Sequence, residues 1–493
     1  MKKDSYFSFI FRRNQALDWL VILASVALGC YFVTRTYPYP RVMSDSYGYI
    51  WAAMKDQFTY LRPFGYSTFL QLLHHLSVSV YSVIVSQALV YALSLGLLTL
   101  AVKKYWPPRN VWIFRCFEAL VALSPAAIFM LNTILSDTLQ CGLVFVLIAM
   151  ALVMIHEGSW TAVIIYTLAL FASFHTRYTS VFFPIAFIPV LVVKGKAIFR
   201  LSAVVLTVAA FMVFHEQRTR NMTKLVLQRQ YSTGFEGWQL ANNAIHVIPF
   251  IMDEENPKAP EEKRVRELHQ FVLRFETANH KIVAKTDNGK RATAAFIWDY
   301  DSPLKQHMVR VLGEKNYAVV WVNLGSGVFK DYGKWLILHY PWQFVKHYLW
   351  PNSKQVFFTT HTEVICGHEE IPAGKSEVVE WFDLPFNKDF SPRGDTFGKI
   401  FRPVLPWIEL LTWLIFLASA VVLFVIGKPR SMSRETRLSL WVLFLFGLVY
   451  YGTVTFASPI SLRYWMPMHA VKLAFAWIAV TGSLRSRASR VRR

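Results

Sequence analysis

Two short polar segments that follow the first apolar run carry side chains able to take part in chemistry. They read SDSYGY at 44–49 and LRPFGY at 61–66. The carboxylate of Asp45 can accept a proton from a substrate hydroxyl group or orient that group. Arg62 supplies a permanent cation that suits a phosphate. Asp45 is also suited to cap an interfacial helix, because Ser and Asp are favoured N-cap residues.

Three further clusters stand beside or within apolar runs. Asp137 either caps the helix that follows it or acts as an ionisable group at a membrane edge, where burial without a partner is costly. Arg177, two residues after His175, interrupts an apolar stretch and needs an anionic partner, which is either Asp137 or a bound phosphate. Arg463, followed by Tyr464, precedes the last apolar run and either extends to lipid head groups or binds a phosphate.

A fourth segment, GFEGWQLANN at 234–243, combines residue types that suit a sugar. Trp238 offers a face for stacking, and Asn242 offers a planar amide for hydrogen bonds. The same residues suit a tight turn with a core tryptophan. Histidines and acids gather again at 361–370, but their spacing matches no closed zinc site, so we predict no metal site there and assign no metal ligands.

The amino-acid composition indicates that these side chains belong to a membrane protein. Of 493 residues, 54% are hydrophobic and only 17% are charged, which excludes an ordinary soluble or disordered protein. The net charge of +21 permits nucleic acid as a partner. However, the basic residues are divided between the ends of apolar runs and one polar stretch. This distribution suits membrane topology, and we expect membrane lipid and no nucleic acid as partners.

The apolar runs predict a mainly α-helical, polytopic membrane protein with about ten transmembrane helices. These runs lie near 17–34, 80–102, 112–131, 135–155, 160–173, 181–193, 197–214, 406–427, 438–457 and 464–482. With the N-terminus in the cytoplasm, the inward loops are 1–16, 103–111, 156–159, 194–200, 428–437 and 483–493. All of them except the short third loop are basic, as the positive-inside rule requires. The polar clusters then lie together on the extracytoplasmic side.

This topology divides the chain into three parts. Residues 1–214 form an N-terminal transmembrane module, whose first outer loop at 35–79 carries the first acid. Residues 215–405 form a small extracytoplasmic domain, for which we expect an α+β fold with a helix near 261–276. Residues 406–493 supply the C-terminal transmembrane helices and a basic cytoplasmic tail.

The first outer loop resembles that of the GT-C membrane glycosyltransferases, in particular the bacterial protein mannosyltransferase and aminoarabinose transferase branch. In that family, an acid soon after the first span is followed by a tyrosine and then by a stretch similar to Arg-Pro-Pro-Gly-Tyr-Pro. Asp45 with Tyr47 and Tyr49 resembles the first part, and Arg62 with Tyr66 resembles the second. Where the family has its later prolines, this chain has phenylalanine and serine.

Later positions are also similar to the family. Asp137 resembles its acid at the start of a later helix, and Arg177 resembles the arginine of its next outer loop. Arg463 and Tyr464 resemble an Arg-Tyr pair near its last helices. The likeness covers the membrane part of the chain and leaves the region at 240–400 without an equivalent.

The resemblance implies a glycosyltransferase of the cytoplasmic (inner) membrane with its active site on the extracytoplasmic side. It would move a sugar from a polyprenyl-phosphate-linked donor to a lipid, glycan or protein acceptor by inverting displacement. Asp45 and Asp137 would be catalytic, and the arginines would neutralise the departing phosphate. The expected substrate-binding residues are Tyr47, Tyr49, Arg62, Tyr66, His175, Arg177, Trp238, Asn242, Arg463 and Tyr464.

No cofactor is required by this chemistry, although some GT-C relatives bind a divalent cation near the acid. The alternatives are a transporter or flippase for lipid-linked glycans, a ligase or polymerase acting on the same lipids, and a non-enzymatic assembly factor. Neither a phosphate-binding loop of the GxxxxGK type nor a GxSxG motif occurs, so ATP-driven transport and serine hydrolysis lack their usual signatures.

Overall fold

The computed structural model describes residues 5–56, 62–186, 235–252, 258–313, 327–358, 376–385, 396–425 and 432–491, with a few single residues between these ranges. Within them the chain is mainly helical and has no β-strand, and one isolated bridge joins Arg41 to Thr133. The prediction of a mainly helical protein is confirmed. The strands expected at 215–405 are absent from the described part of that region.

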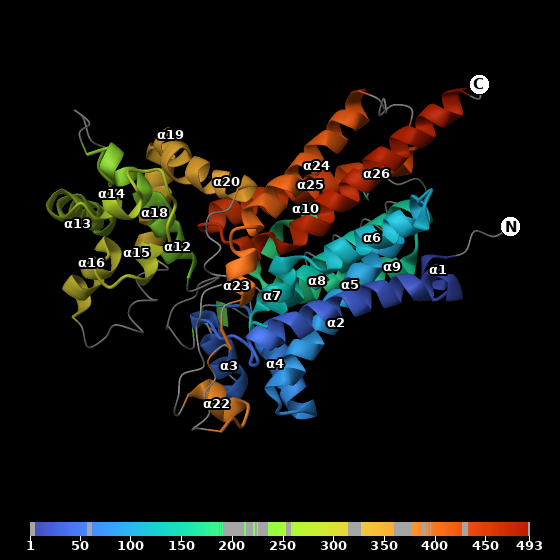
Figure 1. Cartoon of the computed structure of the whole chain (residues 1–493). Helices are drawn as coiled ribbons and strands as arrows, with labels where there is room; N and C mark the ends of the chain where they lie inside the picture. Colours follow the sequence, from blue (N-terminus) through green and yellow to red (C-terminus); the bar gives the residue numbers. More distant parts are fainter. Residues whose placement is uncertain are drawn as a thin grey trace.

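Long apolar helices pack side by side into a bundle (Figure 1). Five described helices are long and apolar enough to cross a membrane: α2 (Ala16–Thr36), α5 (Val80–Tyr105), α8 (Ser136–Glu157), α24 (Leu405–Val425) and α25 (Arg434–Ala457). The shorter α9 (Trp160–Thr176) and the long α26 (Met466–Val491) pack with them. Within a bilayer, such helices satisfy their backbone groups internally. The run expected at 181–193 is described mainly over 181–186, where the chain forms the end of a 3₁₀ helix and a four-residue α-helix. The run expected at 197–214 lies almost wholly outside the described residues.

The run predicted at 112–131 is a broken helix. It forms α6 (Val111–Ala122) and α7 (Pro125–Leu131), which meet at an angle of 50° and would count as a sixth span if taken together. Pro125 has no backbone N–H to continue the first helix, and it favours an extended residue before it. Ser124 lies outside the helical region, with φ −50° and ψ 117°. The break is therefore a consequence of the Ser-Pro step.

Several loops predicted to be cytoplasmic meet at one end of the bundle. The backbone N–H of Tyr6 donates to Glu157 (2.9 Å), and Lys104 forms an ion pair with the same carboxylate (2.6 Å). Arg485 donates to the carbonyl oxygen of Tyr105 (3.3 Å). Both chain termini lie at this end (Figure 1). The charge-based topology therefore grouped these loops correctly.

Short helices cover the opposite end of the bundle. They are α3 (Ser44–Lys55), α4 (Gly65–Leu76), η2 (Tyr178–Phe182), α10 (Phe183–Ala186) and η8 (Leu462–Trp465). The short helices α1 (Tyr6–Ile10) and η1 (Arg13–Gln15) lie at the first end, where the basic loops meet.

The described residues between 235 and 349 form a second helical body, which we call the outer lobe. Its described helices are α12 (Glu236–Ala244), η4 (Ile245–Phe250), α13 (Lys263–Asn279), α14 (Lys281–Lys285), α15 (Ala295–Trp298), α16 (Pro303–Leu312), α18 (Val328–His339), α19 (Pro341–Phe344) and η6 (Val345–Leu349). The lobe has its own apolar core around Trp238, Leu268 and Tyr332, separate from that of the bundle. The helix expected near 261–276 is confirmed as α13.

The chain then returns to the bundle through α20 (Trp350–Phe357), α22 (Glu377–Trp381) and α23 (Thr396–Phe401). Val356 and Val378 belong to the apolar core of the bundle and not to that of the outer lobe.

Two asparagines join the lobe and its return helix to the bundle. Asn243 of α12 donates to two carbonyl groups at the end of α25 (2.8 and 3.2 Å), and Asn352 of α20 donates to two others there (both 2.8 Å). The side-chain oxygen of Asn352 also accepts from the N–H of Ile460 (2.8 Å). The last carbonyl groups of a helix have no partner within it, so these amides satisfy groups that would otherwise be unpaired. They hold the lobe against the end of α25.

Candidate active site

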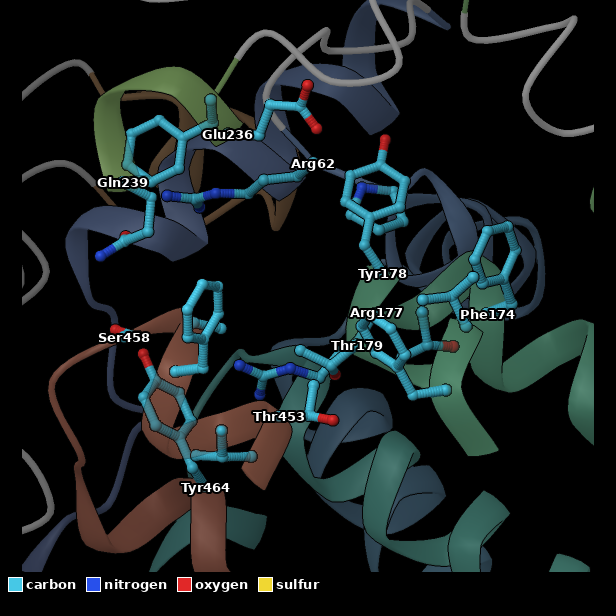
Figure 2. Close-up of a pocket in the computed structure, with 18 of the residues that line it drawn as sticks. Arg62, Phe174, Arg177, Tyr178, Thr179, Glu236, Gln239, Thr453, Ser458 and Tyr464 are labelled. Atoms are coloured by element: carbon cyan, nitrogen blue, oxygen red, sulfur yellow. The ribbon is translucent and has the colours of Figure 1, made fainter. Parts of the chain in front are cut away.

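A cavity of about 890 Å³ lies between the outer lobe and the end of the bundle that is remote from the chain termini. The bundle contributes charged and aromatic side chains, and the lobe contributes polar ones. Figure 2 shows Arg62, Arg177, Tyr178 and Tyr464 around the same hollow as Glu236 and Gln239. The cavity therefore has one wall from each helical body.

Asp45 projects into this cavity from the first turn of α3. The N-cap residue of α3 is Met43, so Asp45 does not occupy the cap position that we considered for it. Ser46 takes the structural role instead, because its hydroxyl accepts from the N–H of Met43 (2.9 Å) and donates to the carbonyl of Ile134 (2.7 Å). The carboxylate of Asp45 lines the cavity.

Two arginines hold the Asp45 carboxylate. Arg62 donates through one nitrogen to Oδ1 (2.5 Å) and through the other to the Asp45 backbone carbonyl (2.8 Å). Arg463 donates to Oδ2 at the longer distance of 3.4 Å. The Arg62 guanidinium also lies over the ring of Tyr49, 5.4 Å from its centroid. Both carboxylate oxygens of Asp45 therefore face cations.

Asp137 forms a second ion-pair group beside the first. It is the second residue of α8, where Leu135 is the N-cap, so it is not the cap either. Arg177, at the C-terminal end of α9, donates to its Oδ1, and Arg463 lies 3.8 Å from its Oδ2. The ion pair between Arg177 and Asp137, one of the two alternatives considered for this arginine, is therefore present. Arg463 connects the two acids.

Tyr464 organises the arginines from the centre of the site. Its ring lies beneath the guanidinium groups of both Arg177 and Arg463, with centroid distances of 4.8 and 4.9 Å. Its hydroxyl accepts a hydrogen bond from Arg463 (3.1 Å). Aromatic faces attract guanidinium groups and restrict their planes, so the ring orients two cations toward one region.

The cluster carries more positive than negative charge. Three guanidinium groups face two carboxylates, namely Asp45 and Asp137. Burial raises the pKa of Asp45, but Arg463, Arg62 and Arg177 outweigh it and hold the pKa below its ordinary value of 3.8. Asp45 is consequently ionised at neutral pH. The remaining positive charge makes the cluster suitable for an anion.

The other residues predicted from the first outer loop lie at different depths. Tyr49 lines the cavity, and its hydroxyl lies 3.1 Å from that of Ser136. Tyr66 is buried behind it and donates to Gln87 (2.9 Å), while Tyr47 packs against the apolar core. These two tyrosines support the site and do not line the cavity.

His175 is a packing residue rather than a wall of the cavity. It is buried, its Nδ1 lies 3.0 Å from the carbonyl oxygen of Phe171, and its ring contacts Phe64 at 4.6 Å. A Cβ atom on Gly65 would lie 2.6 Å from the carbonyl oxygen of His175. The glycine is therefore needed for the close approach of α4 to the end of α9.

The residues proposed for sugar binding in the outer lobe point away from the cavity. Trp238 is in the lobe core against Phe329 (4.5 Å), and Asn242 is buried and donates to the carbonyl of Thr293 (3.0 Å). The opposite face of the same helix lines the cavity through Glu236, Gln239, Leu240 and Asn243. Sequence analysis missed these side chains, which a helical period applied to 236–243 would have separated from the core face.

A divalent cation does not fit this arrangement of acids. All four carboxylate oxygens of Asp45 and Asp137 face guanidinium groups. In the part of the chain that the structure describes, no three His, Cys, Asp or Glu side chains gather to hold a metal ion. The histidines and acids at 361–370 lie outside the described residues.

Comparisons of the chain with protein-family models, curated proteins and solved structures gave no match.

Proposed function

We propose that this chain is a membrane glycosyltransferase that moves a sugar from a polyprenyl-phosphate-linked donor to an extracytoplasmic lipid, glycan or protein acceptor. The observation that carries the proposal is the convergence of Asp45, Asp137 and three arginines at a large cavity at one end of an apolar helix bundle. These residues come from five separate segments of the chain. An assembly of this kind suits a reaction in which a phosphate departs.

The arginines provide a place for the phosphate of the donor. Arg62 and Arg177 line the cavity, and Arg463 lies behind them between the two acids. A polyprenyl phosphate lies with its chain in the bilayer and its charge at head-group depth. The end of an apolar bundle matches that position, and the planar guanidinium groups can each make two hydrogen bonds to phosphate oxygens.

In the proposed reaction, Asp45 acts as the base, and its two arginine partners take up the departing phosphate. The hydroxyl oxygen of the acceptor forms a bond to C1 of the sugar while the bond from C1 to the phosphate oxygen breaks. The electron pair of the broken bond leaves with the polyprenyl phosphate, and the proton of the acceptor passes to Asp45. A phosphate that draws Arg62 and Arg463 away from Asp45 raises the pKa of that carboxyl. Donor binding would thus make the base stronger.

The charges at the two ends of the bundle support the location that we propose. The basic loops meet at one end, and the cavity lies at the other. The positive-inside rule supports placing the cavity on the extracytoplasmic side, and we propose the cytoplasmic membrane as its location. We propose a GT-C-like architecture of about ten spans, in which the runs at 181–193 and 197–214 supply spans additional to those described.

The proposal is tested with the purified full chain in lipid nanodiscs. Synthetic polyprenyl-phosphate monosaccharides serve as donors, an extract of cell-envelope lipids and glycans serves as acceptor, and released polyprenyl phosphate is measured. We expect Asp45→Asn to lower the rate by about 10²-fold or more, the range of general-base catalysis. The matched control is Asp331→Asn, which alters an exposed acid on α18 and should keep the full rate.

The outcome separates this proposal from its alternatives. Full activity in Asp45→Asn would show that Asp45 is not the base. If the wild-type chain releases no lipid phosphate from any donor but moves a fluorescent lipid-linked sugar across the membrane, it is a transporter. Release of lipid diphosphate from a diphosphate-linked glycan would instead indicate a ligase or polymerase.

A further inference from the structure

The wall of the cavity that the outer lobe supplies has a different chemical character from the arginine cluster. Glu236 of α12 and Lys330 of α18 form an ion pair there, and their side chains are about one-third exposed, at 33% and 34%. Gln239, one helical turn after Glu236, lines the same wall (Figure 2). This wall carries no net charge from its ion pair, whereas the arginine cluster carries an excess of positive charge.

The helix that presents this wall is held firmly in place. A Cβ atom on Gly333 of α18 would lie 2.9 Å from backbone atoms of Leu240 and Ala241, so α12 and α18 are in backbone contact. Asn243 anchors the end of α12 to the carbonyl groups of Phe456 and Ala457. The polar face of α12 is therefore fixed relative to the bundle. Rigid placement favours selective recognition over a solvent-exposed, adaptable surface.

The polar groups of this wall match the hydroxyl groups of a sugar. The Glu236 carboxylate accepts hydrogen bonds, and the Lys330 ammonium donates them. The Gln239 amide donates to Asn243 (3.0 Å) and retains its carbonyl oxygen as an acceptor. Phe235, which also lines the cavity, is braced by a stacked Trp298 at 5.8 Å and offers an apolar face. Alternating polar groups beside an aromatic ring are typical of carbohydrate sites.

We propose that Glu236, Lys330 and Gln239 form a binding subsite for a neutral pyranose, separate from the arginines that take the phosphate. This inference rests on the proposed function, because it assigns the sugar of that reaction to the lobe wall. The subsite selects hydroxyl-bearing, uncharged rings, since its ion pair offers both a donor and an acceptor without a net charge. An anionic sugar would gain nothing from this pair over a neutral one.

Binding measurements on the full chain in nanodiscs test the subsite directly. The probes are methyl pyranosides, a methyl uronoside and farnesyl phosphate, and affinity is measured by calorimetry. We expect Glu236→Gln and Lys330→Met each to weaken binding of the best methyl pyranoside by about tenfold, the effect of one hydrogen bond to a charged group. Farnesyl phosphate affinity should stay unchanged in both variants. Lys334→Met, on an exposed position of the same helix α18, is the matched control.

Two arms distinguish the source of the sugar. If farnesyl-phosphate-linked monosaccharide prevents methyl pyranoside from binding, the subsite holds the sugar of the donor. If both bind together, it holds the acceptor. Glu236→Gln also lowers kcat/KM for the corresponding substrate, and thermal unfolding confirms that the variants remain folded.

The subsite and the proposed function can fail separately. Unchanged pyranoside affinity in the Glu236→Gln, Lys330→Met double variant would overturn the subsite, as would tighter binding of the uronoside than of the neutral sugar. Normal farnesyl phosphate binding in that case would leave the arginine site standing. If the wild-type chain does not bind farnesyl phosphate, the proposed function on which the subsite rests is overturned.

Discussion

Two clusters of buried acids and bases in the described part of the chain differ in their access to the outside. In the open cluster, Asp45 and Arg177 are each 26% exposed and border the cavity. In the closed cluster, Glu409 of α24 accepts from His469 and from Lys472 (2.9 Å), both of α26. Glu409 and Lys472 are almost fully buried. Similar ion pairs therefore occur both beside the cavity and in the buried contact between α24 and α26.

The closed cluster is complete in itself. Each carboxylate oxygen of Glu409 has one partner, the second ring nitrogen of His469 lies 3.1 Å from the Ser124 hydroxyl, and Lys472 lies over the ring of Trp413 (4.6 Å). In contrast, the open cluster has an unbalanced guanidinium group beside a cavity. The difference teaches that access and charge balance, and not the presence of buried ions, mark the candidate binding site.

The largest expected effect comes from opening the closed cluster. Glu409→Leu leaves Lys472 buried without a counter-charge, and we expect unfolding free energy to fall by about 3–5 kcal/mol. Denaturant titration in detergent measures the loss. The triple change of Glu409, His469 and Lys472 to leucine should recover much of it, because no isolated charge remains. Wild-type stability in Glu409→Leu would show that the cluster is not closed as described.

Changing the charge of the open cluster should have smaller effects on stability than opening the closed cluster. Removing an acid should lower stability, whereas removing an arginine should lower phosphate binding. Asp137→Asn removes a partner of Arg177 and leaves three cations facing one acid, so we expect a loss of about 1.5–3 kcal/mol in stability. Arg62→Gln brings the cluster to neutrality and should change stability little. It should nevertheless weaken farnesyl phosphate binding by about tenfold or more.

Measurements on Arg62→Gln and Asp137→Asn test whether the open cluster binds an anion or only stabilises the fold. Thermal unfolding and calorimetric binding are measured on both, with Lys334→Met as the control for an exposed cation. If Arg62→Gln unfolds as readily as Asp137→Asn and binds the phosphate normally, the open cluster is as structural as the closed one.

The sequence predicted much of the bundle because lipid leaves few alternatives for an apolar run. The runs near 17–34, 80–102 and 135–155 become helices with bounds close to those expected, since each must satisfy its backbone internally. Basic residues correctly grouped the loops at one end. The acids and arginines of the open cluster were also recognisable, because ionisable groups at the ends of apolar runs are costly without partners.

Two features escaped prediction for different physical reasons. Glu409 and Lys472 are 63 positions apart, so their pairing depends on how α24 packs against α26, which composition does not reveal. In the outer lobe, the residue types at 236–243 indicated polar recognition, but the choice of Trp238 and Asn242 selected the face that packs into the core. Only the phase of the helix distinguishes them from Glu236 and Gln239.

Acidification should destabilise the outer lobe, because His246 is buried there without an acidic partner among the described residues. Burial lowers the pKa of His246 to about 4, although it lies near the carbonyl of Asn242 and accepts from the N–H of Thr293. Its unfolded form has the ordinary value of 6.5 and binds a proton first, so lobe stability is complete above pH 6.5 and falls as the pH approaches 4. At pH 5 the loss is about 2 kcal/mol.

Hydrogen exchange of α12 and η4 between pH 8 and 4.5, corrected for intrinsic rates, measures this loss. His246→Gln should flatten the pH dependence, while Asp45→Asn should leave it unchanged over this range. The reason is that the arginines hold the pKa of Asp45 below 3.8, so its contribution is lost only under more acidic conditions. A cation without an anion thus gives up its charge on burial, whereas an acid among guanidinium groups keeps it. A pH profile that His246→Gln does not alter would assign the acid sensitivity to another group.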